Sequence, residues 1–405
     1  MSVARQRRRH EIHPMVDEFR SHRRRGWRRT VPRLSQFAFE HLLLLPLGVA
    51  IALAWANLSA ESYFRFSYAA AFAVNDVAMV FFFAVMTKEV VEATAPGGVL
   101  HSWRRALMPV IASFGVALVP ALIHLALVEP LDEPMLGVAW PVTLASDVAV
   151  CYLAARLIFG RAHAAIPFAI LLAIASDAIG FVALALLSPN REPHWTAGLL
   201  ILLVAMGGAM AFRRLRLRSF WPYLLGPGAL AWFALYWSGL HPALSLVLIV
   251  PFLPHAARDP GFFVDASPDA KDTLSQFEVF WRYPAQLALF FFGLVNAGVP
   301  LRTLEQGTWA LPIAVLVGKP AGILLGAGVA VLAGFRLPHH VSWRDLIVIG
   351  CGAAIGFSVG LFFCAALIPP GQIRSEVSMG VLLTLAGLPL ALIAAKLLGV
   401  GRFAR

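Results

Sequence analysis

The sequence predicts an all-α polytopic membrane protein with about 12 transmembrane helices. Of its 405 residues, 59% are hydrophobic and only 14% are charged, whereas soluble domains have about 45–50% and about 25%. Apolar runs long enough to cross about 30 Å of hydrocarbon recur along the chain. Asp147, Asp177 and Lys319 lie inside such runs. A charge at the bilayer centre costs about 2.5–3.5 kcal/mol, so each of them indicates a functional site.

The apolar runs predict a single transmembrane domain over residues 36–400. In chain order, the expected spans are 39–58, 66–90, 105–128, 136–159, 165–187, 195–212, 222–238, 241–254, 279–296, 310–333, 345–368 and 377–399. The hydrophilic stretch at about 255–278 is too short for a domain, and we expect it to be a cytoplasmic linker.

The charges of the short loops predict the orientation, because cytoplasmic loops carry excess Arg and Lys. With the N-terminus inside, the inner loops hold Arg104, Arg105, Arg156, Arg161, Arg213, Arg214, Arg216, Arg218, Arg336 and Arg344. The outer loops contain ESYFR, EPLDEP, SPNREP and GQIRSE, which are neutral to acidic. We therefore expect both termini in the cytoplasm.

The first 35 residues form a basic arm. Eleven arginines up to Arg33 supply most of the net charge of +11, and the arm lacks the apolar core of a signal peptide. We expect a partly disordered cytoplasmic segment that contacts anionic lipid headgroups. Basic runs attract any polyanion, so docking to a partner protein or nucleic acid is the alternative, although we expect no nucleic acid.

The cysteines and loops predict neither a cofactor nor an enzyme. Cys151, Cys351 and Cys364 lie inside expected spans as small packing residues, and no pair has metal-ligand spacing. No nucleophile, base and orienting group assemble in the loops.

Helix breakers interrupt two spans. Pro141 precedes Thr143, Ser146 and Asp147 in the fourth span, and GCGAAIGFSVG places four glycines in the middle of the eleventh. Two interrupted helices in corresponding halves of a chain indicate a transporter ion site, because unwound backbone is tolerated in a membrane only where it lines a cavity. Small residues that permit close helix packing are the alternative for the glycines.

The depth of the three charges predicts that they meet. Asp147, Asp177 and Lys319 lie about nine to twelve residues from the ends of their spans, which is roughly 14–18 Å of helix rise. All three would then lie near the midplane. A purely structural buried ion pair is the alternative, although such pairs add little stability.

Four motifs give the chain its resemblance to a known family. They are NDVAMVFFFAVMTKEV from Asn75, WPVTLASDVA from Trp140 continuing to IASDAIG at Ile174, NAGVPL from Asn296, and GKPAGI from Gly318 followed by IGFSVG. In this order they resemble the NhaA family of bacterial sodium/proton antiporters, from about residue 36 to 399.

The resemblance implies an NhaA-like fold, in which an inverted repeat relates spans 3–5 to spans 10–12 and the broken fourth and eleventh helices cross. It implies multi-pass insertion in the bacterial inner membrane, a homodimer as one assembly, and a role in pH homeostasis. The family's cation-binding aspartate falls on Asp177, its broken-helix Thr-Asp pair on Ser146 and Asp147, and its central lysine on Lys319. Asn75 and Asp76 match a pair near the ion pathway, and Glu89 matches an acidic residue linked to pH response.

The chain departs from the family at two places. Ser176 replaces the first aspartate of the family's adjacent pair, so Lys319 lacks its expected partner. We expect Lys319 to form a salt bridge with Asp177 instead, or to be neutral. The start of the ninth span, QFEVFWRYP, has Glu278 and Arg282 but no histidine, which leaves inherited pH sensing open.

The predicted function is secondary exchange of Na⁺ or Li⁺ for H⁺, with these ions as the only ligands. The expected cation and proton ligands are Asp177, Asp147, Ser176, Ser146 and Thr143, with Asp177 and Asp147 binding sodium and Lys319 compensating charge. Because Ser176 cannot release a proton, a ratio nearer one proton per cation is expected. The alternatives are a non-transporting sensor or assembly subunit, and a sodium-coupled transporter of organic anions.

Overall fold

The computed structural model describes residues 44–94, 103–160, 163–187, 194–255, 272–303 and 305–404. Every regular element in these ranges is a helix. The predicted basic arm and most of the predicted linker lie outside them. Leu45–Arg405 forms one compact unit, whose fold is described below.

The elements follow one another with short connections. The α-helices are α3 Leu44–Leu58, α4 Ala60–Ala71, α5 Met79–Thr94, α6 Trp103–Val128, α7 Pro134–Val138, α8 Val148–Phe159, α9 Ala165–Leu187, α10 Trp195–Arg214, α11 Trp221–Tyr223, α12 Ala229–Trp237, α13 Ser245–Ile249, α14 Thr273–Asn296, α15 Gly307–Leu332, α16 Trp343–Ala353, α17 Phe357–Leu367, α18 Gln372–Leu383 and α19 Gly387–Leu398. Two π-helical segments, η1 (Phe72–Ala78) and η4 (Leu224–Gly228), continue α4 and α11, and the 3₁₀ segment η3 (Trp140–Leu144) follows α7. The remaining 3₁₀ turns are η2 Glu129–Leu131, η5 Pro242–Leu244, η6 Val250–Phe252, η7 Leu301–Thr303, η8 Thr384–Ala386 and η9 Gly401–Phe403.

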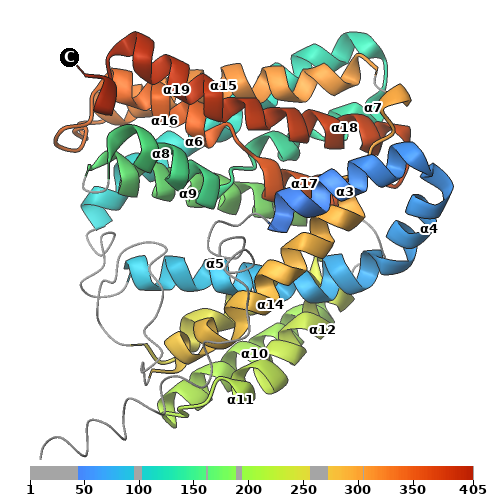
Figure 1. Cartoon of the computed structure of the whole chain (residues 1–405). Coiled ribbons are helices and arrows are strands. Elements are labelled where there is room, and N and C mark those ends of the chain that lie inside the picture. The colour runs from blue at the N-terminus through green and yellow to red at the C-terminus, as the bar shows by residue number, and fades with distance from the viewer. Residues whose placement is uncertain are drawn as a thin grey trace, which may run out of the picture. The chain divides into compact units, whose positions relative to one another are not determined.

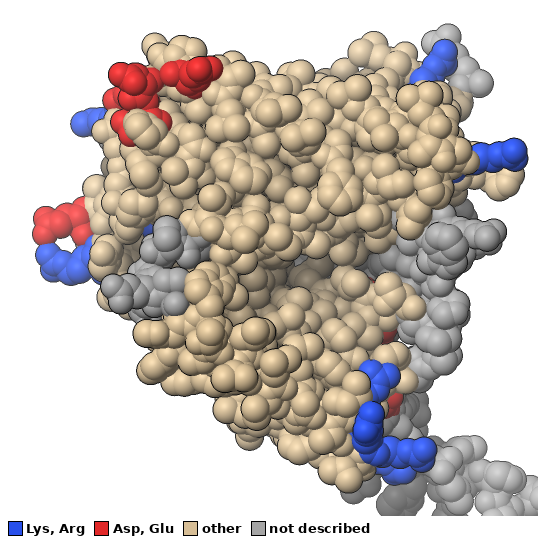
Figure 2. Space-filling view, turned by 180° about the vertical axis from the view of Figure 1, so that it is seen from behind, with Lys and Arg blue, Asp and Glu red and all other residues tan. Residues whose placement is uncertain are grey.

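Six helical stretches of the described chain are long and apolar enough to cross a membrane, or up to eight if each of two bent helix pairs is one span. The six are Ala60–Glu92, Leu107–Leu131, Ala165–Leu187, Trp195–Arg214, Gly307–Leu332 and Gln372–Phe403. The face in Figure 2 has a broad uncharged middle, with acidic and basic side chains at its edges. The chain is thus a multi-pass membrane protein, whereas the number of 12 spans and the inverted repeat remain predictions.

Several boundaries differ from those expected. The expected ninth span, 279–296, is part of α14, which begins earlier, at Thr273. The Asp272 side chain is its N-cap and accepts a hydrogen bond from Ser275 N at 3.1 Å. The helix therefore takes the last residues of the predicted linker, including Glu278. The expected span 241–254 is a short helical stretch at Pro242–Phe252. Polar capping residues lie outside apolar runs, so hydropathy alone does not find such helix ends.

The helices form two groups (Figure 1). In the first, called the α15 group, α15 packs on α6, α16 and α18, and α8, α9, α17 and α19 complete it. In the second, the α14 group, α14 packs on α4, η1 and α5, and α10 to α13 lie beside α5 and one another. Aromatic rings join the groups: Phe362 of α17 lies 4.8 Å from Phe83 of α5 and 6.4 Å from Phe292 of α14, between ring centroids.

Glycines allow α6 and α15 to pack backbone to backbone. A Cβ on Gly326 would lie 2.7 Å from Ala112 O, and Cβ atoms on Gly322 and Gly115 would each collide with the other residue's carbonyl oxygen. The hydrophobic effect does not drive helix association inside a bilayer. Small residues let the two backbones approach closely, so that van der Waals packing stabilises the contact instead. The close α6–α15 contact fixes α15, and with it Lys319, against the rest of the α15 group.

A buried charge cluster joins α5 to α14. The Lys88 side chain is 1% exposed, and its Nζ lies 3.3 Å from Glu89 Oε1, 2.8 Å from Glu92 Oε2 and 2.7 Å from Glu278 Oε2. Glu278 is on the first turns of α14, and the other residues are on the last turns of α5. Breaking a buried ion pair leaves an uncompensated charge, so the two helices depend on Lys88 at this end.

Replacing Gly322 with valine should destabilise the protein by about 1–3 kcal/mol or more, because backbone atoms of α6 cannot yield as a side chain can. The measurement is thermal unfolding of the purified protein in detergent. Gly328→Val on the same helix is the matched control, because a Cβ at Gly328 meets nothing within 4 Å. Equal stability of the two variants would show that the α6–α15 contact is looser than described.

Replacing Lys88 with methionine should cost about 3–5 kcal/mol, because three carboxylates then share a buried site without a cation. Thermal unfolding measures the loss, and Lys396→Met, at an exposed position of α19, is the control. Adding Glu278→Gln to the Lys88 variant should restore part of the stability. A Lys88 variant as stable as the Lys396 variant would contradict the assignment.

Candidate functional site

Two broken helices meet inside the α15 group. The chain bends by 52° between Pro134–Leu144 and Val148–Phe159, and by 51° between Trp343–Ala353 and Phe357–Leu367. The breaks touch: Asp147 N donates to Ile355 O at 2.6 Å, and a Cβ on Gly356 would lie 2.5 Å from Ala145 O. The expected interruptions of both helices are confirmed, and Gly356 is needed because no side chain fits there.

Asp147 caps the two helices that begin at the breaks. Its Oδ1 accepts from Val150 N in α8 at 3.3 Å, and its Oδ2 accepts from Ser358 Oγ at 2.7 Å and from Ser358 N in α17 at 3.3 Å. A carboxylate at a helix N-terminus satisfies free N–H groups and is favoured by the helix dipole. One side chain thereby holds two N-terminal ends together.

Lys319 occupies the opposite helix ends. Its Nζ donates to Leu144 O at 3.4 Å, to Ser146 Oγ at 2.8 Å and to Ala353 O at 3.0 Å, and it also contacts Ala145 O. Leu144 and Ala353 are the last residues of η3 and α16, where carbonyl groups lack intrahelical partners. A fully buried ammonium is thus satisfied by oxygens at the C-terminal ends.

Of the two expectations for Lys319, the salt bridge with Asp177 is wrong for this structure, whereas a neutral Lys319 stays a prediction. Within the residues described, no ion pair joins Lys319 to a carboxylate. The prediction took a carboxylate as the natural partner of a buried ammonium. In an intact helix the backbone carbonyl oxygens accept hydrogen bonds from the next turn. At the two breaks they are available, and together with the Ser146 hydroxyl they bind the Lys319 ammonium instead of a carboxylate.

Asp177 and Ser176 face the same break from α9. Ser146 N donates to Asp177 Oδ1 at 2.7 Å, and Ser176 Oγ donates to Leu144 O at 2.7 Å. Leu144 O is also a partner of Lys319, so the serine hydroxyl and the ammonium share one acceptor. Four of the five predicted ligands and Lys319 are therefore brought together, and all are buried.

Thr143 is the one predicted ligand whose side chain bonds within its own helical segment and not at the break. Its hydroxyl donates to Trp140 O at 2.7 Å, inside η3. Such a bond to the preceding turn is a common local use of a threonine hydroxyl. Thr143 supports the helix end that Lys319 caps, and its Oγ1 is committed to that local bond.

The three predicted pathway residues belong to the α14 group. Asn75 is in η1 and exchanges two amide hydrogen bonds with Asn296 of α14, at 3.2 and 2.7 Å. The backbone oxygen of Asp76 accepts from Trp232 Nε1 at 2.8 Å. Glu89 is part of the Lys88 cluster.

Sequence reasoning missed Ser358, Lys88 and Glu92. Ser358 follows the glycine break of the eleventh span directly, a position where a hydroxyl can meet the helix-capping Asp147. Lys88 and Glu92 are spaced i, i+4, which places them on one helix face. These signals were present, but the pairing of Lys88 with Glu278 depends on packing between helices.

The oxygen set suits a hard monovalent cation. Two carboxylates, hydroxyl groups and backbone carbonyls without intrahelical partners surround the breaks, and oxygen ligands are what alkali and other hard cations prefer. Among the described residues no group of three or more His, Cys, Asp or Glu side chains could hold a metal ion.

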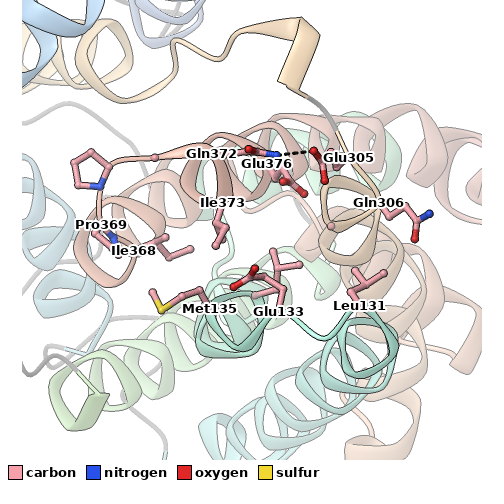
Figure 3. Close-up of a pocket in the computed structure, with 14 residues that line it drawn as sticks. Leu131, Glu133, Met135, Glu305, Gln306, Ile368, Pro369, Gln372, Ile373 and Glu376 are labelled. Carbon is pink, nitrogen blue, oxygen red and sulfur yellow. Dashed lines mark hydrogen bonds between the residues drawn. The ribbon is translucent and has the colours of Figure 1, made fainter.

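A cavity of about 670 Å³ lies elsewhere, where Glu133, Glu305 and Glu376 approach one another (Figure 3). It opens between the segments around α7, the start of α15 and the start of α18. None of the predicted site residues lines it. Gln372 bridges it with a 2.6 Å hydrogen bond to Glu305.

Comparisons with known proteins identify the family of the chain. The profile of the Na⁺/H⁺ antiporter 1 family matches residues 37–398. The chain is 38% identical over 374 residues to the Na(+)/H(+) antiporter NhaA of Geotalea uraniireducens (strain Rf4), covering 89% of this chain and 96% of that protein. It is also 38% identical over 380 residues to the Na(+)/H(+) antiporter NhaA of Desulfitobacterium hafniense (strain DSM 10664 / DCB-2), covering 92% and 97%.

A solved structure shares the fold. The sodium proton antiporter MjNhaP1 from Methanocaldococcus jannaschii superimposes with a TM-score of 0.57 at 15% identity, covering 89% of this chain and 92% of that one. The relatives carry the names of transporters, which does not favour the sensor or the organic-anion alternative. On the sequence match and the relatives together, this chain belongs to the NhaA family of sodium/proton antiporters.

Proposed function

We propose that this protein exchanges Na⁺ or Li⁺ for H⁺ across the bacterial inner membrane by letting the cation and the proton compete for Asp177 and Asp147. The observation that carries the proposal is the meeting of two broken helices around these carboxylates and Lys319. We also propose the 12-span topology with its inverted repeat, both termini in the cytoplasm and no resident cofactor.

The net charge of the site sets how many ions bind. With Asp147, Asp177 and Lys319 ionised, two carboxylates face one ammonium, which leaves one net negative charge. A buried uncompensated charge is expensive, so the site favours one monovalent cation or one proton at a time. Competition for one vacancy couples the two fluxes.

Asp177 is the proposed exchange point. Both carboxylate oxygens of Asp147 accept hydrogen bonds at helix N-termini, whereas Asp177 accepts a single backbone hydrogen bond, from Ser146 N. No other described residue donates to the second carboxylate oxygen of Asp177. That oxygen, with Ser146 Oγ, Ser176 Oγ and Leu144 O, would bind the cation, and Thr143 supports this end of η3.

Lys319 is proposed to hold the site in its cation-free state. Its ammonium already occupies oxygens that a sodium ion would use, namely Leu144 O and Ser146 Oγ. An arriving cation must displace it from at least some of them. Lys319 therefore compensates the site's charge and acts as a tethered competitor for the cation.

The remaining predictions concern the surroundings of the site. Asn75 and Asp76 would line the pathway, and Glu89 with the Lys88 cluster would form the cytoplasmic mouth. The described ion-pair partners of Lys88 are all glutamates, so a response to pH at this cluster would depend on carboxylates. We retain as proposals the contact of the arm with anionic lipid, the homodimer and the role in pH homeostasis.

Removing the exchange carboxylate should abolish transport. In proteoliposomes, Asp177→Asn should show no sodium-driven proton release above background, because the amide neither takes a proton nor balances the cation's charge. Asp132→Asn, on an exposed turn, is the matched control and should behave as the unaltered protein. Full exchange by a folded Asp177→Asn protein would refute the proposed site.

The stoichiometry should appear in the response to voltage. Exchange of one proton per cation moves no net charge, so an imposed membrane potential should leave the native rate unchanged. Ser176→Asp adds a third carboxylate beside Asp147 and Asp177, and exchange by this variant should become voltage-dependent, since moving one charge is worth about 2.3 kcal/mol per 100 mV. Strong voltage dependence of the native protein would contradict the single-vacancy argument.

A further inference from the structure

A hydrogen bond from Arg374 crosses between the two helical groups. Arg374 is on the first turn of α18 in the α15 group, and its Nη2 donates to Oδ1 of Asn296, at the end of α14, at 2.9 Å. We propose that this contact is a latch that closes the ion site to the outer side of the membrane. The inference rests on the proposed ion site and orientation for the side that it closes, and on the proposed exchange for its transport readout.

The acceptor is held rigidly. Asn296 Nδ2 donates to Asn75 Oδ1 at 2.7 Å and to Phe292 O at 3.0 Å, and its Oδ1 accepts from Asn75 Nδ2 at 3.2 Å as well as from Arg374. Both amide groups are buried. All hydrogen-bonding groups of the Asn296 amide are thus used, and Asn75 fixes its orientation.

Asn75 is itself in an irregular helical segment. It lies in η1, the π-helical segment between α4 and α5, and π-bulges often occur at functional sites. Trp232 Nε1 donates to the backbone oxygen of the next residue, Asp76, at 2.8 Å, which anchors η1 to α12. Three elements of the α14 group, namely η1, α12 and α14, therefore hold the acceptor of the Arg374 hydrogen bond in place.

The donor side is anchored within its own group. Two residues before Arg374, Gln372 donates to Glu305 at 2.6 Å, which ties the first turn of α18 to the segment that leads into α15 (Figure 3). Cys364 Sγ lies 3.6 Å from the backbone oxygen of Arg374 and ties this turn to α17. Farther along, the groups meet through apolar contacts between aromatic rings such as Phe292 and Phe362, which carry no hydrogen bond.

The position of the latch determines which side it closes. Arg374 belongs to the stretch GQIRSE, whose residues from Gln372 on form the first turns of α18, at the end that the loop charges assign to the outside. Alternating access in transporters with broken helices moves one bundle against another around a fixed site. An outward opening must separate α18 from α14 at this end, and the Arg374–Asn296 bond has to break.

Distances between spin labels test the latch without transport. The full chain would carry Tyr68→Cys on α4, 75% exposed, and Pro370→Cys, exposed beside α18; the native cysteines are buried. Arg374→Met should raise the population with the longer label distance about tenfold, the factor expected for one hydrogen bond to a charged group. Arg374→Lys should restore most of the original distribution.

Arg65→Met is the matched control, because Arg65 is on α4 and forms an exposed pair with Glu61. Its distance distribution should equal that of the unaltered protein. An unchanged distribution in Arg374→Met, or the same change in Arg65→Met, would overturn the latch.

Sided transport gives the second readout. In oriented vesicles, Arg374→Met should lower the half-saturating sodium concentration on the outer side and raise it on the inner side, because only the access equilibrium shifts. A merely damaged site would weaken both sides, and that result would also overturn the latch. If the unaltered protein shows no exchange while the label distances still shift, the proposed function fails and the latch stands.

Discussion

The structure depends on the opposite capping of four helix ends at one point in the membrane. Lys319 satisfies carbonyl groups at the C-terminal ends of η3 and α16, and Asp147 satisfies N–H groups at the N-terminal ends of α8 and α17. Inside a bilayer each unsatisfied backbone group costs several kcal/mol. The two side chains therefore lower the cost of breaking two helices inside the bilayer, and the backbone oxygens released at the breaks bond to Lys319 instead.

This arrangement requires close packing behind it. Lys319 can reach both breaks only because α15 lies directly against α6 through Gly322, Gly326 and Gly115. On the other side, Gly356 lets Ala145 O approach the second break. Gly356, one of the four glycines of the eleventh span, thus lies at the helix break and also permits close packing, so the two alternatives weighed for these glycines do not exclude one another at this position.

The sequence predicted the breaks but not every partner. Pro141 and the glycine run located both interruptions, because these residues act on their own backbone. The partners of Lys319 and the pairing of Lys88 with Glu278 were missed, since they depend on how helices far apart in sequence pack. The start of α14 was missed for a similar reason. Glu278 is charged, so hydropathy places it in a loop, but Lys88 of α5 pairs with it and it is buried inside the helix.

The two buried polar clusters, one at the helix breaks and one around Lys88, differ in net charge. At the breaks one ammonium faces two carboxylates, and at the Lys88 cluster one ammonium faces three. The second cluster therefore keeps the larger negative charge when all groups are ionised, and it would concentrate cations at the proposed mouth. The site itself needs only one positive charge to become neutral. With an aspartate in place of Ser176, the same count gives three carboxylates to one ammonium, so the site would need two positive charges, which is why we propose that this position sets the charge moved per exchange cycle.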